Sequence, residues 1–181
     1  MTNHRALGGL VASALIAVSG FSTAAESGLA ETVRSLIGFS EFLPIMPAPM
    51  GETGCINLGG GLLLMDGNDL DEWSFGEASC KKRTVILLKH SFGSPGNGVG
   101  WRIVDAFLLP ALRHGDELFQ QGDCEVDGKT NTSFVAIVHL GRRDRVDHRN
   151  GVLAAWTVDP QAGKIVALDT KRVVCYPPTP P

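Results

Sequence analysis

The chain has 181 residues and a formal net charge of −3 at neutral pH. This length suits a single domain with a sizeable core once any targeting segment is set aside. A mildly acidic chain is a poor candidate for binding the phosphate backbone of nucleic acid, so we expect no nucleic-acid partner.

The first 25 residues have the order of a secretory signal peptide. Arg5 adds positive charge near the amino terminus, residues 6–21 are almost all small or apolar, and small residues continue to Ala25. The apolar run is shorter than the ~20 residues that a membrane-spanning helix needs. We therefore predict cleavage after Ala25 or one residue earlier, a periplasmic or secreted protein, and no membrane insertion after cleavage.

Four cysteines, Cys55, Cys80, Cys124 and Cys175, remain after this processing. An even number of cysteines in an exported chain predicts disulfides, for which three pairings exist. No Cys-x-x-Cys spacing indicates a zinc or redox site. We predict the sequential pairing, Cys55–Cys80 and Cys124–Cys175, because each bond then closes one of two segments on either side of a Gly-rich loop.

Next in chain order come a helix and a connector. Residues 27–37 place Leu29, Val33 and Ile37 four residues apart, which predicts a short amphipathic helix packed on the core. Three prolines between residues 42 and 51 exclude a helix and a central strand. This segment is therefore predicted to be an extended connector.

The middle of the chain carries strand patterns at 61–65, 84–89 and 101–109, the last favoured as a strand by its β-branched residues. An acidic stretch covers residues 66–72. It departs from the order of a calcium-binding loop because Leu70 and Asp71 occupy the places of an oxygen ligand and a glycine. We predict a solvated turn there.

The last third of the chain predicts an antiparallel meander. Its expected strands are residues 133–140, 152–158, 164–168 and 172–175, joined by short turns. Residues 117–126 are expected to pair ahead of this meander through a turn at Asp127-Gly128. The Cys124–Cys175 bond would then join the first and last strands of one sheet.

These elements predict an α+β, mainly β, fold with an N-terminal helix, a C-terminal antiparallel meander and two disulfides. The predicted organisation is a signal peptide at 1–25, a helix and Pro-rich connector at 26–54, a single disulfide-bonded domain at 55–175, and a disordered Pro-rich tail at 176–181.

Two features that suggest cofactor chemistry do not meet its requirements. The Gly-rich loop at 93–100 lacks the Lys and the helix of a phosphate-binding loop, and Trp101 stands where a dinucleotide fingerprint needs glycine. The histidines that remain after processing, His90, His114, His139 and His148, form no short-range ligand pair. We therefore expect no cofactor or metal, and we predict that His139 is half-buried on the strand face of Val135 and Ile137.

Residues 141–150 hold the most distinctive local sequence, here called the arginine loop. It contains Arg142, Arg143, Arg145 and Arg149 together with Asp144, Asp147 and His148. Its place between two predicted strands indicates an exposed hairpin loop. Two interpretations stay open: a solvated loop of self-paired charges, or a partner-binding loop, since arginine pairs with carboxylates and is enriched at interfaces.

Taken together, these features predict an exported, non-enzymatic binding protein of an inhibitor, immunity or envelope-accessory type, with a protein partner at the four arginines. Two alternatives remain. One is a small exported hydrolase that uses His114 or His139 with a carboxylate; the other is a structural envelope protein.

Overall fold

A computed structural model describes residues 23–42, 47–65, 68–92, 100–120, 123–130 and 133–176. The predicted signal peptide up to residue 22, the Gly-rich loop at 93–99 and the tail beyond Tyr176 lie outside these ranges. No helix in the described ranges is long and apolar enough to cross a membrane.

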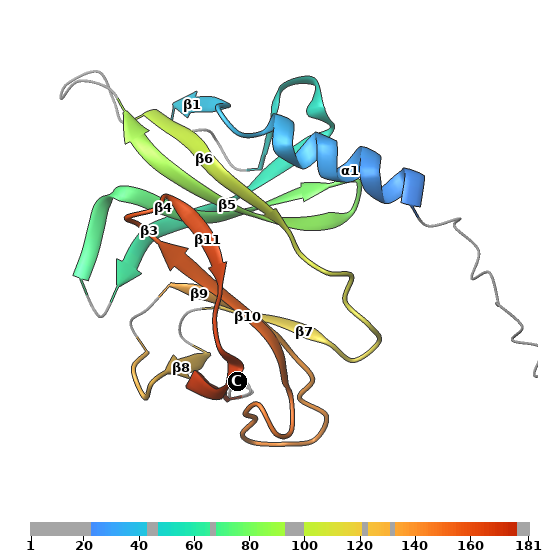
Figure 1. The fold of residues 1–181 in the computed structure, drawn as a ribbon, viewed down its shortest axis with the longest axis vertical. Coiled ribbons are helices and arrows are strands. Elements are labelled where there is room, and N and C mark those ends of the chain that lie inside the picture. Colours follow the sequence, from blue (N-terminus) through green and yellow to red (C-terminus); the bar gives the residue numbers. More distant parts are fainter. Residues whose placement is uncertain are drawn as a thin grey trace, which may run out of the picture.

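The elements stack in four layers (Figure 1): one helix, then sheets of six, four and two strands. All strand pairings between these elements are antiparallel. The predicted fold class is therefore confirmed: mainly β, with one helix near the N-terminus and both predicted disulfides, Cys55–Cys80 and Cys124–Cys175.

The six-stranded sheet has the order β1-β6-β5-β4-β3-β2. Its strands are β1 (Ser40–Phe42), β2 (Ala48–Pro49), β3 (Cys55–Met65), β4 (Asn68–Cys80), β5 (Arg83–Phe92) and β6 (Gly100–Leu108). The Pro-rich segment supplies β2 at the sheet edge, where proline is tolerated. The prediction of a turn over residues 66–72 was wrong for residues 68–72, which belong to β4, and residues 66 and 67 lie outside the described ranges.

Helix α1 (Thr23–Ser35) covers one face of this sheet. Leu29 and Val33 are buried against it as predicted, but Ile37 is 44% exposed and Leu36 is fully buried in its place. The cause is that the helix ends at Ser35, and the following turn changes the periodicity that the prediction extended to residue 37.

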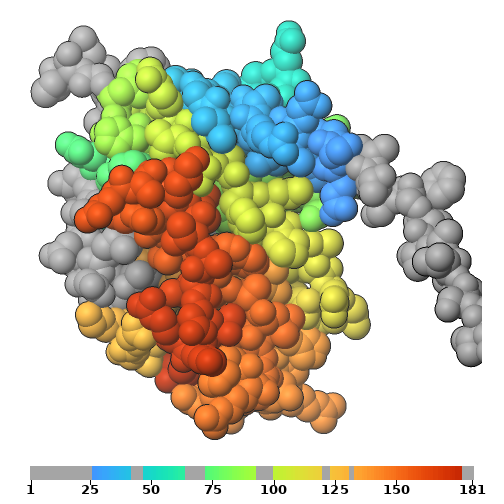
Figure 2. All heavy atoms as spheres, in the orientation of Figure 1, coloured from blue at the N-terminus to red at the C-terminus, as the bar shows by residue number. Residues whose placement is uncertain are grey.

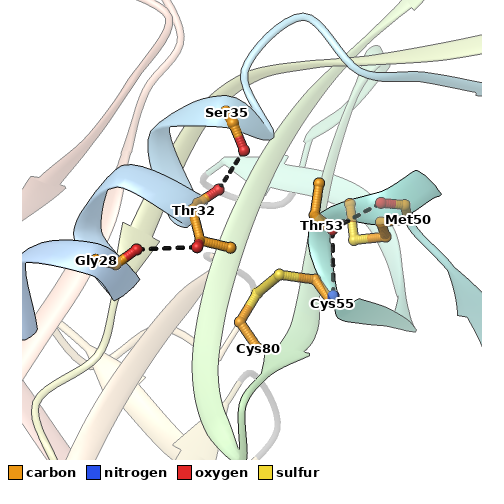
Figure 3. Close-up of a disulfide and its surroundings, with 7 residues drawn as sticks. All are labelled: Gly28, Thr32, Ser35, Met50, Thr53, Cys55 and Cys80. Atoms are coloured by element: carbon orange, nitrogen blue, oxygen red, sulfur yellow. Dashed lines mark hydrogen bonds between the residues drawn. A yellow bond between two sulfur atoms is a disulfide. The ribbon is translucent and has the colours of Figure 1, made fainter. Parts of the chain in front are cut away.

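The first disulfide lies in the core beneath this helix (Figure 3). Cys55 and Cys80 are directly opposite on β3 and β4, with their Cα atoms 4.2 Å apart. The Cys55 carbonyl accepts from the Met50 N–H at 2.9 Å, and its N–H donates to Thr53 Oγ1 at 3.2 Å. The pair is therefore of the non-hydrogen-bonded kind, in which opposite side chains come closest.

A buried polar cluster draws distant strands of the same sheet together. Lys89 of β5 pairs with Glu41 of β1, and both side chains are less than 10% exposed. Asn57 of β3, which is fully buried, donates to both carboxylate oxygens of Glu41, at 2.9 and 2.8 Å. Strands β1 and β3 have three strands between them in the sheet order, so this face is strongly curled.

The four-stranded sheet, β11-β10-β9-β7, packs on the other face of the first sheet. Its strands are β7 (Glu117–Gln120), β9 (Phe134–Val138), β10 (Val152–Asp159) and β11 (Lys164–Ala167). Asp105 of β6 joins the two sheets by accepting the Ile165 N–H at 2.8 Å. The remaining two-stranded sheet consists of β8 (Cys124–Val126) and β12 (Val173–Cys175).

The prediction of one C-terminal meander was wrong in its last step. Strand β12 does not follow β11 in the four-stranded sheet but pairs with β8, so Cys124–Cys175 lies within a sheet of its own. This small sheet covers the outer face of β9, burying Phe134, Ala136 and Val138. The opposite face of β9, with Val135, packs toward the six-stranded sheet. Both faces of the predicted alternating strand are therefore buried.

Candidate functional site

The arginine loop joins β9 to β10 and is exposed at every residue except Val146 and Asp147. Val146 is fully buried and exchanges two backbone hydrogen bonds with Cys175, each at 2.9 Å. Cys175 is in turn bonded to Cys124. The middle of the loop is thus held by the disulfide-bonded strand β12.

The second half of the loop is a tight turn organised by Asp147. Its carbonyl accepts the N–H groups of Asn150, Gly151 and Val152 at 2.9–3.1 Å, and its carboxylate accepts the Arg149 N–H at 2.8 Å. A Cβ at Gly151 would lie 2.7 Å from the His139 carbonyl oxygen and 2.8 Å from Val146 Cγ1. Only glycine fits without displacing backbone, so the turn has one close-packed arrangement.

A second turn, residues 111–116, faces this loop. Asp116, whose side chain is only 6% exposed, accepts the Arg113 N–H at 3.0 Å and lies 3.2 Å from Nδ1 of His139. Gly115 has a φ of +84° and packs against the imidazole, so closely that a Cβ would lie 3.0 Å from His139 Cε1. The carboxylate and the glycine together fix the orientation of the His139 ring.

The prediction for His139 was wrong in its position. Its side chain is half-buried, at 48% exposed, but it lies just beyond the end of β9 rather than on the strand face of Val135 and Ile137. The strand ends at Val138, where the chain turns away from the sheet, so the alternation that suggested a core histidine does not extend to it.

The loop and the turn enclose an open cleft with a volume of about 530 Å³. The charged and imidazole side chains that line it are Arg113, His114, Asp116, His139, Arg143, His148 and Arg149, and residues 150–153 complete the wall. Figure 1 shows the two segments, one between β6 and β7 and the other between β9 and β10, at the same end of the four-stranded sheet. In Figure 2 they form the yellow and orange surface at the lower right.

The structure divides the four arginines of the loop into two pairs. Arg143 and Arg149 line the cleft, whereas Arg142 and Arg145 do not. Arg145 pairs with Asp147 at 3.5 Å, while an Arg143 guanidinium nitrogen donates to the Leu140 carbonyl at 3.3 Å. The interpretation as a self-paired loop therefore describes Arg145 but not the arginines of the cleft.

The cleft carries positive charge in an acidic protein. Three arginines against one aspartate leave an excess of two positive charges, before any proton on its three histidines is counted. Among the described residues, the guanidinium groups of Arg113 and Arg149 have no hydrogen-bond or ion-pair partner. The site therefore presents unneutralised donors to whatever enters it.

The chemistry of this set favours binding an anion. Arginine offers paired donors that match carboxylate geometry. With its Nδ1–H donated to Asp116, His139 turns Nε2 toward a ligand, as an acceptor when the ring is neutral and as a donor to an anion when it is protonated. The lining residues include no serine, threonine or cysteine that could act as a nucleophile. Over the described ranges no group of three or more His, Cys, Asp and Glu side chains could hold a metal ion.

Sequence reasoning found the loop but missed its opposite wall. Asp116 and His139 are 23 residues apart, and they meet only because β7 pairs with β9 in a register that sets Glu117 opposite Val138. Asp116 belongs to the turn at residues 111–116. The pairing of this turn with the end of β9 carried no local signal.

A comparison with known protein families, curated proteins and solved structures finds no match for this chain. Its two disulfides are consistent with an extracellular or periplasmic protein.

Proposed function

We propose that this chain is an exported, non-enzymatic binding protein of an inhibitor, immunity or envelope-accessory type. Its partner site is the cleft between the arginine loop and residues 111–116. The observation that carries this proposal is the convergence of Arg143 and Arg149 from the loop with Arg113 from the facing turn, in one cleft with a single carboxylate. The partner is a protein that presents carboxylate side chains, since these pair with arginine in the geometry its guanidinium prefers.

The anchoring of the loop supports binding. A loop that is already ordered loses little conformational entropy when a partner docks. Val146 is fixed to Cys175, and Asp147 closes the turn that carries Arg149. The guanidinium of Arg149, unpaired among the described residues, favours binding over a purely structural role for this anchored loop.

The partner site is tested by reversing charge at matched positions. Arg143→Glu with Arg149→Glu should remove partners from the pull-down profile of the tagged mature protein in native envelope extract. The control is Arg142→Glu with Arg145→Glu, which changes the net charge of the same loop by the same amount at positions outside the cleft. This variant should still capture the partners. Both variants should melt within a few degrees of wild type, because exposed charges contribute little to folding. An unchanged profile in the cleft variant would refute the proposed site.

Export itself is a separate part of the proposal, and it is supported by the signal-peptide order of residues 1–25 together with the two disulfides. The intact mass of the protein from a periplasmic or culture fraction should correspond to a chain that begins at Glu26 or Ala25. A full-length chain in that fraction would contradict it.

One contact favours hydrolysis as a second candidate. The 3.2 Å contact between Asp116 and His139 is the arrangement in which a carboxylate orients a general base. In the absence of a side-chain nucleophile in the cleft lining, the nucleophile would be water. A panel of ester and peptide substrates tests this. If the wild type turns over a substrate and His139→Ala does not, hydrolysis would replace binding as the proposed function.

A further inference from the structure

Three of the four histidines that follow the predicted signal peptide line one cleft. They come from separate places in the chain: His114 from the turn after β6, His139 from the end of β9, and His148 from the arginine loop. The fourth, His90, lies elsewhere on β5, where its ring is 4.6 Å from that of Trp73 and 3.7 Å from a Glu72 carboxylate oxygen.

We propose that the cleft takes up carboxylate groups of an acidic peptide segment and holds them more tightly as the pH falls. This inference rests on the proposed function, of which it names the ligand chemistry and the regulation. The imidazoles stand beside arginines that already attract anions, so each proton gained by a histidine adds a positive charge where the ligand lies.

The charges around these histidines are the following. Arg113 and Asp116 share the turn of His114, and Asp116 also contacts His139. Arg143 and Arg149 share the loop of His148. Asp147 accepts the backbone N–H of Arg149, and its other carboxylate oxygen pairs with Arg145. Asp144 belongs to the same loop but does not line the cleft.

Asp116 supports this assignment through its position. Its carboxylate is buried and committed to the Arg113 N–H and to Nδ1 of His139, on the far side of the ring from Nε2. A protonated His139 therefore keeps one N–H on Asp116 and offers the other to the ligand. The same ring without that proton offers Nε2 only as an acceptor, which a carboxylate cannot use.

The ligand used to test the inference is a hexaglutamate peptide, whose carboxylates remain ionised between pH 5.5 and pH 7.5. The signals of the histidine Cε1 protons are followed by NMR in the mature protein as the peptide is added. We expect the signals of His114, His139 and His148 to move and that of His90 to stay. The affinity at pH 5.5 should exceed that at pH 7.5 by at least about fivefold, the effect of one added charge at close range in water.

Variants separate the two parts of the inference. Arg143→Glu with Arg149→Glu should abolish the shifts at both pH values. His139→Gln should reduce the gain in affinity at pH 5.5, whereas His90→Gln, outside the cleft, should keep the whole gain. Sulfate, a dianion at both pH values, serves as the competing oxyanion and should bind more weakly than the peptide.

Several results would overturn this inference. Equal affinity at both pH values removes the pH dependence, and tighter binding of sulfate than of hexaglutamate removes the assignment to carboxylates. Peptide-induced shifts of His90 as large as those in the cleft would show non-specific binding. Each of these leaves the proposed partner site intact, because that proposal fails only if the Arg143→Glu, Arg149→Glu variant keeps the wild-type pull-down profile.

Discussion

Cys55–Cys80 and Cys124–Cys175 each join residues that lie directly opposite on antiparallel strands, with Cα atoms 4.2 and 3.9 Å apart. The strands around them differ greatly in length. β3 and β4 pair along 11- and 13-residue strands beneath a helix, whereas β8 and β12 are three residues each. The first bond reinforces structure that many other contacts already specify, while the second is the main constraint on a small sheet.

The position of the arginine loop also depends on the small sheet. Its strand β12 holds Val146 at the centre of the arginine loop through two backbone hydrogen bonds. The first disulfide lies in a core with α1 and touches no part of the cleft. The Cys55–Cys80 bond therefore contributes to stability in one half of the molecule, whereas the Cys124–Cys175 bond also maintains the geometry of the candidate site in the other half.

Removing each disulfide in turn gives the largest expected effect. Closing 25- and 51-residue separations stabilises by about 3.5 and about 4 kcal/mol in the chain-entropy model. We expect Cys55→Ala with Cys80→Ala to lower the free energy of unfolding by that amount and keep hydrogen-exchange protection at the Val146 amide. Cys124→Ala with Cys175→Ala should lower the free energy of unfolding and also remove the exchange protection of the Val146 amide. Urea unfolding and amide exchange measure the two effects. Equal loss of Val146 protection in the two variants would break the comparison.

The buried cluster of the six-stranded sheet tests how much that half depends on polar contacts. Lys89→Met leaves the Glu41 carboxylate buried without its ammonium partner, which should cost at least about 3 kcal/mol. Adding Glu41→Gln should recover much of this loss, because the neutral amide still accepts from Asn57. Lys164→Met is the control: its 3.2 Å pair with Asp105 is half exposed and should contribute less than about 1 kcal/mol. Denaturant unfolding of the three variants measures both.

Glycine substitution contrasts the two halves at the level of one methyl group. Gly151→Ala would set a Cβ 2.7 Å from the His139 carbonyl oxygen, and we expect it to cost about 1–3 kcal/mol and to disorder the cleft. Gly61→Ala in β3 meets no atom within 4 Å and should change the free energy of unfolding by less than about 0.5 kcal/mol. Thermal melts of both proteins check this. A neutral Gly151→Ala would mean that the loop is less tightly packed than described.

Substitutions in the turn beside the first disulfide should stabilise the protein. Lys81 and Lys82 link β4 to β5 with φ of 50° and 65°, left-handed values that cost a residue with a Cβ about 1–2 kcal/mol each. Both positive φ values are those of a two-residue hairpin turn that prefers Asn-Gly. Lys81→Asn with Lys82→Gly should therefore stabilise the protein by about 1 kcal/mol in urea unfolding. Lys81→Ala with Lys82→Ala keeps both Cβ atoms and should give no such gain.

The smallest expected effect concerns acid. Arg172 binds the Asp127 carboxylate at 2.6–3.2 Å, and this hydrogen bonding lowers the pKa of Asp127 below its ordinary 3.8. The resulting stabilisation is present above that ordinary value and is lost as the pH falls through the lower folded pKa. We expect the Arg172 Nε–H signal in NMR to lose its hydrogen-bonded shift over that acid range. The signal should be independent of pH in Asp127→Asn.

Much of the fold was predictable because its signals are local. Leu29 and Val33 repeat at helical spacing, Ile103 and Val104 favour a strand, and the order of the cysteines along the chain suggested the pairing that the structure has. These signals depend on near neighbours in sequence. The helix, several strands and the covalent framework followed from them, but β4, the longest strand, was not predicted.

What could not be predicted depends on how distant segments meet. Nothing in residues 172–175 distinguishes pairing with β11 from pairing with β8, so the sheet assignment of β12 was wrong. Glu41, Asn57 and Lys89 look like exposed polar residues in sequence, and only the curl of the six-stranded sheet buries them together. The cleft has the same origin. Its arginines were visible in sequence, but the contact between Asp116 and His139 was not.

The hydrogen bonds between Val146 and Cys175 join the arginine loop to a strand that comes later in the chain. A chain leaves the ribosome from its amino end, so the six-stranded sheet and its disulfide have all their residues before the arginine loop is made. The loop can form its hydrogen bonds to β12 only after β12 has been synthesised. The cleft therefore depends on one of the last segments of the chain to be synthesised, because residues 173–175 must be present before Val146 can be held.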